Sequence, residues 1–194
     1  MIKQTESTWR DVPRIVANVK DVARRKRHTR SLLAFCVCYL HYRFSSTPGE
    51  RRLNAVREYE KAILTDRLYY VPNLGRGEGR TTLCIGAVLF KLVTSKNAVV
   101  RIVSSSNMSA EHIVGHIHRE LATNDLLIED FPEICNSILG TGPIATKFTV
   151  QIPALYEDGE QVAGGSVVSA FNSFQEMYRN TLGSGQEGTV LIDP

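Results

Sequence analysis

The sequence predicts an α/β fold with a parallel sheet. Residues 68–71 are aromatic and β-branched, residues 83–93 form an apolar run of helical length, and residues 98–103 again favour a strand. Ser109 is placed to cap a further helix over residues 110–122. This strand-helix-strand-helix order needs crossover connections, which favour parallel strands. With 194 residues, the chain is long enough for one domain with a sizeable core.

The region before this unit is predicted to be helical. Residues 12–42 carry a broken apolar stripe that ends in a dense apolar cluster, and residues 53–64 have apolar side chains three to four apart. Residues 45–49, which contain Ser, Thr, Pro and Gly, separate the two segments. We therefore expect a basic helical segment over residues 1–45 and an α/β domain over residues 46–194.

The rest of the chain carries weaker signals. Residues 124–134 predict a short helix and a turn, and the glycine-rich residues 183–188 predict an exposed turn. Strand candidates follow the helix and turn at residues 148–152, 167–171 and 189–192.

The charge of the chain is unevenly distributed. Residues 1–61 hold 14 Lys and Arg against 6 Asp and Glu, whereas residues 62–194 hold 9 against 14. The densest basic run, residues 24–30, either contacts phosphates or forms the solvated face of a helix, and the second interpretation is favoured. The acidic side chains of residues 125–133 have a spacing that suits acid–base pairing and a solvated helix face equally well, and no catalytic role is assigned to them.

Several classes of protein are excluded by simple patterns. The four cysteines lie in apolar stretches without C-x-x-C spacing, which disfavours a disulfide framework or a zinc site. No apolar run approaches the roughly 20 residues that cross a bilayer, and the first residues lack the apolar core of a signal peptide. We therefore expect a cytoplasmic protein without a membrane partner.

A glycine-rich loop lies between the first strand candidate and the apolar run that follows. A phosphate-binding loop needs small residues around the phosphate, a cation on the β/γ oxygens and a hydroxyl group on Mg²⁺. Gly75, Gly77 and Gly79 meet the first need, and Thr81, followed by Thr82, stands where the hydroxyl belongs. The strand-loop-helix context therefore favours phosphate binding, although a tight connection without a ligand stays open.

Two positions depart from the usual pattern G-x-x-x-x-G-K-[ST]. Leu74 stands in place of the first Gly, and Arg80 stands in place of Lys. Arg keeps the positive charge, but its planar guanidinium is bulkier than an ammonium group and fits differently between two phosphates. We expect nucleotide binding to survive this exchange better than hydrolysis does.

A nucleotide hydrolase also needs an acidic residue at the end of a hydrophobic strand, to hold Mg²⁺ and to orient the attacking water. Residues 189–193, with the sequence TVLID, have this form and end in Asp193. Any strand can end in Asp, so this feature indicates a nucleotide hydrolase only because the glycine-rich loop is also present.

Four stretches carry a family resemblance. Residues 75–84, GRGEGRTTLC, resemble the P-R-G-x-G-K-T-T-L loop of phage terminase large subunits. Residues 121–133, LATNDLLIEDFPE, are similar to that family's E-L-x-x-N-x-x-L-x-x-D-F-P-E stretch, and residues 46–64 resemble its approach segment. Residues 190–194 resemble its L-V-x-L-D-D-P strand end, with Ile192 in place of one Asp.

This resemblance implies a P-loop NTPase (RecA-like) sheet in an ATPase that drives double-stranded DNA into a viral capsid. The implied cofactors are ATP and Mg²⁺, and the implied partners are double-stranded DNA, the portal protein, the small terminase subunit and further copies in a ring. The host cytoplasm is the implied location. The sheet is expected to be incomplete, because the chain stops before the coupling motif and the remaining core strands of such a motor.

The resemblance also assigns roles by position. Arg80 takes the place of the catalytic Lys, Arg76 occupies the position of the loop arginine, and Thr81 with Asp193 would hold Mg²⁺. Which of the two acidic roles Asp193 fills stays open. The implied nucleotide-binding residues are Gly75, Gly77, Glu78, Gly79, Arg80, Thr81 and Thr82.

Other functions remain open on the sequence alone. The chain is alternatively an inactive terminase remnant, or a DNA- or protein-binding module whose basic helices hold the partner while the loop is vestigial. An unrelated P-loop protein, such as a small kinase, leaves the D-F-P-E resemblance unexplained. His112 and His116 have a spacing that can hold zinc, but the H-E-x-x-H pattern is absent and a polar helix flank is favoured.

Overall fold

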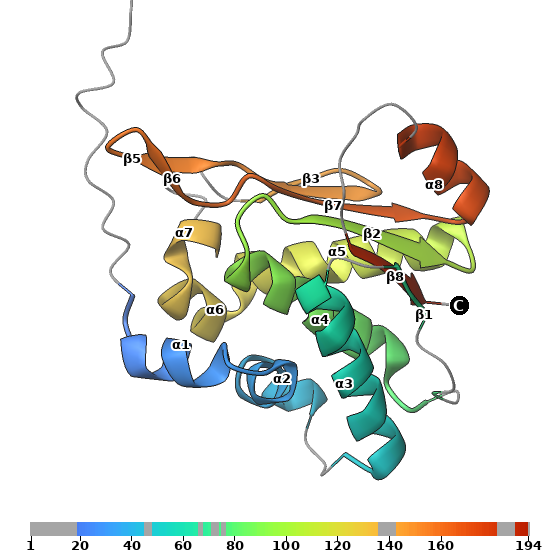
Figure 1. Cartoon of the computed structure of the whole chain (residues 1–194), viewed down its shortest axis with the longest axis horizontal. Helices are drawn as coiled ribbons and strands as arrows, with labels where there is room; N and C mark the ends of the chain where they lie inside the picture. The colour runs from blue at the N-terminus through green and yellow to red at the C-terminus, as the bar shows by residue number, and fades with distance from the viewer. Residues whose placement is uncertain are drawn as a thin grey trace, which may run out of the picture.

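The computed structural model has a six-stranded mixed sheet with most of the helices on one of its faces (Figure 1). The residues that the structure describes are 19–44, 48–65, 68–70, 74, 77–135, 143–181 and 189–193. The predicted α/β class with a mostly parallel sheet is confirmed in this part of the chain. No helix within these ranges is long and apolar enough to span a bilayer.

The six-stranded sheet has the order β1-β8-β2-β7-β4-β3. The first four of these strands run parallel, and β4 and β3 continue the sheet in the antiparallel sense. The bounds are β1 (Leu68–Tyr70), β8 (Thr189–Asp193), β2 (Val99–Ser104), β7 (Ser166–Phe171), β4 (Thr149–Ile152) and β3 (Ile144–Ala145). A separate antiparallel ribbon joins β5 (Leu155–Glu157) to β6 (Glu160–Ala163). Because β8 lies between β1 and β2, the strands of the predicted βαβα unit are not neighbours.

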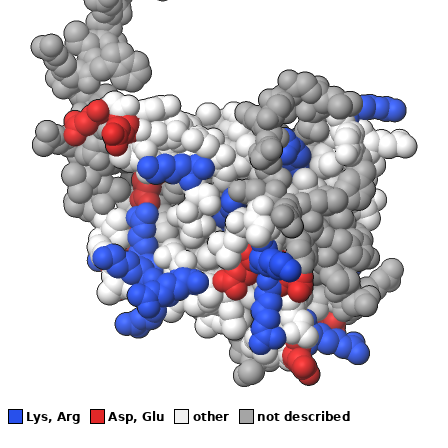
Figure 2. All heavy atoms as spheres, in the orientation of Figure 1, with Lys and Arg blue, Asp and Glu red and all other residues white. Residues whose placement is uncertain are grey.

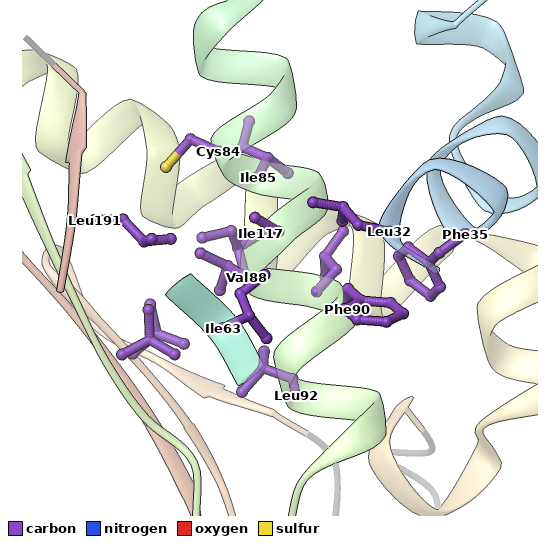
Figure 3. Packing of buried hydrophobic residues seen from close by; sticks show 14 of the residues in the cluster. Leu32, Phe35, Ile63, Cys84, Ile85, Val88, Phe90, Leu92, Ile117 and Leu191 are labelled. Carbon is purple, nitrogen blue, oxygen red and sulfur yellow. The ribbon is translucent and has the colours of Figure 1, made fainter. Parts of the chain in front are cut away.

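Helix α4 (Arg80–Thr94) is the centre of the main core (Figure 3). All of its residues 83–92 are buried, and the one charged residue among them, Lys91, donates from Nζ to the Ile63 carbonyl at 2.9 Å. It is enclosed by Leu191 of β8, Ile63 of α3 (Glu50–Thr65), Phe35 of α2 (Leu32–Tyr39) and Ile117 of α5 (Asn107–Thr123). The loop that precedes α4 is therefore attached to the most deeply buried element of the fold.

Helix α2 approaches α4 closely because Gly86 has no side chain. A Cβ atom on Gly86 would lie only 2.5 Å from Cys36 Sγ. Burial raises the pKa of Cys36 to about 12, so this thiol stays neutral and packs as a small apolar group. All four cysteines are free thiols.

The prediction of helical structure over residues 12–42 is confirmed in the described part of this segment. Two helices are found, α1 (Val22–His28) and α2, followed by a 3₁₀ turn, η2 (His41–Arg43). Ser31 has an extended backbone and its Oγ accepts a hydrogen bond from Ala34 N at 3.2 Å, which caps α2 and separates it from α1. Residues 12–18 lie outside the described part.

Further boundaries also differ from the sequence prediction. Helix α5 is capped by Ser106 rather than Ser109, because Ser106 Oγ accepts from Ser109 N at 3.1 Å. The helix and turn expected near residue 130 form α6 (Asp125–Asp130) and α7 (Pro132–Cys135). Helix α8 (Phe174–Thr181) was not predicted, and residues 183–188 lie outside the described part.

The basic run on α1 is partly bound to the acidic residues that follow α5. Arg24 forms two contacts of 2.6 Å with the two carboxylate oxygens of Asp130, and Tyr39 OH donates to the same carboxylate at 2.7 Å. Arg25 lies 2.6 Å from Glu133 Oε1. Because Asp130 is fully buried, the solvated-face interpretation is wrong for this carboxylate and for these two arginines.

The remaining basic side chains of this run are exposed. Lys26, Arg27 and Arg30 face solvent, and Figure 2 shows Lys and Arg gathered over α1. The solvated interpretation therefore holds for this half of the run.

A second polar cluster joins η2 to α5. Arg43 Nη2 lies 3.2 Å from His116 Nδ1 and 3.3 Å from Glu120 Oε1, and Tyr42 OH donates to Glu120. Asn124 Nδ2 also donates to Glu120, at 3.1 Å. Because Arg43 can only donate, its contact with His116 requires an unprotonated Nδ1.

Protonation of His116 is expected to destabilise the fold. Burial, the charge of Arg43 and the neighbouring His112 lower the pKa of His116 below its ordinary value. A lowered pKa gives stability that is present above the unfolded-state pKa, near 6.5, and is lost as pH falls through the folded-state pKa. The urea midpoint should therefore fall more between about pH 7 and pH 5 in the wild type than in His116→Gln. Parallel midpoint profiles for the two proteins would contradict this role.

Candidate functional site

The two motifs predicted to act together lie at one edge of the sheet. Strands β1 and β8 are parallel neighbours, with Leu68 opposite Val190 and Tyr70 opposite Ile192. The loop that follows β1 and the last residue of β8, Asp193, therefore extend from the carboxyl edge of the sheet, where open α/β sheets bind ligands. Gly75, Arg76 and the side chain of Asp193 lie outside the described part.

The described half of the loop has the backbone that only glycine adopts readily. Gly77 and Gly79 have φ angles of 85° and 79°, in the left-handed region. Gly79 is the N-cap of α4, and its carbonyl accepts from Leu83 N at 2.9 Å. A glycine at the cap brings no side chain to the helix start, and the first turn of α4 contains no acidic residue. The positive end of the helix dipole thus favours an anion here.

The predicted side chains of the loop follow one another at the start of α4. Arg80, Thr82 and Glu78 are half-buried, and Thr81 is exposed. A cation and a hydroxyl group are therefore placed on the first turn of a helix whose later residues are fixed in the core. In a phosphate-binding loop, the cation and the hydroxyl group likewise stand at the start of the helix.

Arg52 is a member of this site that the motif analysis missed. Its guanidinium carbon lies 4.3 Å from the centre of the Phe44 ring, a distance at which cation and ring attract each other. A Cβ atom on Gly79 would lie 3.2 Å from Arg52 Nη2, so this arginine is close to the start of α4. Its buried Nε forms no hydrogen bond to a described group.

A cavity of about 470 Å³ lies beside Arg52 and the loop, a size typical of small-molecule sites. The start of α3 forms one wall and the loop forms the other. Its lining residues are Pro48, Gly49, Glu50, Arg51, Arg52, Gly77 and Glu78. The approach segment and the glycine loop, which the sequence analysis treated as successive motifs, thus enclose one space.

Sequence reasoning missed Arg52 because its role depends on the direction of α3. The residue reads as one of several charged positions in an amphipathic helix, and neither the ring beneath it nor the glycine beside it has a fixed spacing from it. The Pro48-Gly49 break before α3 was the available signal, since it allows the helix start to turn toward the loop.

Comparison with known proteins adds no family to this geometry. No protein-family model matches the chain, and no curated protein sequence matches it. A functional assignment therefore depends on the sequence motifs and on the arrangement at the carboxyl edge of the sheet.

Proposed function

We propose that this chain binds ATP–Mg²⁺ at the glycine loop in the manner of a P-loop NTPase, as the ATPase segment of a viral DNA-packaging terminase large subunit. One observation carries the proposal: β1 and β8 pair in parallel, so the loop and Asp193 share one edge of the sheet. The terminase part rests on the resemblance of residues 75–84 and 121–133.

The residues at this edge fit the chemistry of a magnesium nucleotide. Gly77 and Gly79 allow the backbone to turn closely around a phosphate group, and Arg52 and Arg80 supply positive charge. The hydroxyl of Thr81 and the carboxylate of Asp193 are oxygen ligands of the type that Mg²⁺ prefers. When bound, Mg²⁺ would neutralise the charge that develops on the phosphate oxygens during transfer.

Binding of a fluorescent ATP analogue in the presence of Mg²⁺ tests the proposal. We expect Thr81→Ala and Arg52→Ala each to raise the Kd by about tenfold or more, because each removes a contact to a charged group. Arg57→Ala is the matched control for Arg52, because Arg57 lies on α3 but is exposed and does not line the cavity. A wild-type protein that binds no nucleotide at any concentration would refute the proposal.

A binding module without turnover is the second candidate, and Arg80 favours it because a guanidinium replaces the compact ammonium of the usual loop.

In either case DNA is the proposed polyanionic partner. Since Arg24 and Arg25 are paired with carboxylates, the exposed Lys26, Arg27 and Arg30 are the groups on α1 proposed to contact its phosphates. The portal protein, the small terminase subunit and further copies in the host cytoplasm remain proposed partners.

A further inference from the structure

A buried hydroxyl group at the end of β2 has no hydrogen-bond partner among the residues that the structure describes. Ser104 is only 4% exposed, and its Oγ forms no hydrogen bond to any described residue. A hydroxyl that is buried without a partner loses the hydrogen bonds that water gave it, which destabilises the folded state. An unpaired group of this kind is expected where a ligand completes the bonding.

The position of Ser104 relates this group to the candidate site. Ser104 is the last residue of β2, and its neighbour on β8 is Asp193. Helix α5 begins three residues later, at Asn107, and has no acidic residue in its first turn. The carboxyl edge therefore combines the end of β8, the unpaired hydroxyl and the positive end of a second helix dipole.

The side chain of Ser104 faces the side of the sheet that carries α4. Residues alternate between the two faces of a strand, so Ser104 shares a face with Val100 and Ile102. These two belong to the main core around α4, whereas Val103 packs with Met177 of α8 on the other face. The hydroxyl and the loop that precedes α4 are thus on the same side of the sheet.

The strand order indicates which part of a nucleotide would reach Ser104. The loop leaves from β1, and β2 is the second strand away, with β8 between them. Two strand spacings correspond to about 10 Å. A terminal phosphate that extended from the loop across the end of β8 would therefore lie toward Ser104 at the end of β2.

We propose that Ser104 is a positioning residue whose hydroxyl donates a hydrogen bond to the terminal phosphate of the bound nucleoside triphosphate, directly or through one ordered water molecule. This inference rests on the proposed function. The proposed hydrogen bond would distinguish a triphosphate from a diphosphate. It would also account for a hydroxyl group in a buried position where alanine would pack.

The full chain carrying Ser104→Ala tests this role through two measurements. Without nucleotide, the variant should melt at the wild-type temperature or up to roughly 4 °C higher, because an unpaired buried group has been removed. In titrations with labelled nucleotides, its Kd for the triphosphate should rise about tenfold, while its Kd for the diphosphate stays unchanged. Ser105→Ala, which alters the exposed neighbour, should change neither quantity.

The other outcomes are distinct. A lower melting temperature with unchanged affinity for both nucleotides shows that the hydroxyl is structural and overturns the inference alone. An equal loss of affinity for both nucleotides overturns the assignment to the terminal phosphate. A wild-type chain that binds neither nucleotide overturns both the inference and the proposed function. If Thr81→Ala loses nucleotide binding but Ser104→Ala binds the triphosphate as the wild type does, the inference is overturned and the proposed function is supported.

Discussion

Replacing Asp130 with Ala is expected to lower the free energy of unfolding by about 3–5 kcal/mol. The Asp130 carboxylate is fully buried and accepts two contacts of 2.6 Å from Arg24 and one of 2.7 Å from Tyr39. Removal of the carboxylate leaves the partly buried Arg24 guanidinium with only its 3.0 Å contact to Glu129, and it leaves the Tyr39 hydroxyl without its acceptor, which costs more than the ion pair itself contributes. Urea denaturation at neutral pH measures the change.

Two further variants make this prediction specific. Asp125→Asn changes an exposed carboxyl group on the same helix and should alter the unfolding free energy by less than about 1 kcal/mol. Tyr39→Phe removes one hydrogen bond to Asp130 and should cost about 1–2 kcal/mol, which keeps the measurement possible if Asp130→Ala does not fold. An Asp130→Ala protein as stable as the wild type would show that the network does not hold α1 on α6.

This network illustrates what the sequence did not reveal. Arg24 and Asp130 are 106 positions apart, and each lies in a stretch whose charges are typical of a solvated helix. The burial of Asp130 and its pairing with Arg24 follow from the packing of α1 and α2 against the end of α5 and α6, for which no local pattern exists. The D-F-P-E stretch is therefore a structural element in this chain: Asp130 and Glu133 hold basic side chains, and the Phe131 ring lies 4.8 Å from the Arg25 guanidinium.

The parts of the fold that sequence reasoning did predict have local causes. The central helix α4 is marked by an apolar run interrupted only by Lys91, and the loop before it by glycines that a left-handed backbone requires. The sequence predicted strand β8 and its acidic end but not its pairing with β1, since the order of strands depends on contacts across the whole chain. Ser104 illustrates the limit, because a serine at a strand end is an ordinary turn residue until its burial is known.

Replacing Arg80 with Lys is expected to raise the rate of ATP hydrolysis by at least about tenfold. The guanidinium is planar and bulky, whereas the ammonium group of Lys is compact and fits between the β- and γ-phosphates. It can therefore stabilise the negative charge that develops on the leaving group. Arg80 begins α4, so a new side chain there is held by the same buried helix and should leave the loop unchanged. The Kd for the nucleotide should change by less than the rate, since both residues carry one positive charge.

Release of inorganic phosphate under saturating ATP–Mg²⁺ measures the effect, and two variants interpret it. Arg57→Lys makes the same exchange at an exposed position on α3 that does not line the cavity, and it should leave hydrolysis unchanged. The double variant Arg80→Lys, Thr81→Ala should not show the increased rate of hydrolysis, because the increase depends on the same site that Thr81 belongs to. If Arg80→Lys binds nucleotide as the wild type does but hydrolyses none, Arg80 is not what limits turnover, and the site is a nucleotide-binding module in which the loop fixes a conformation without doing chemistry.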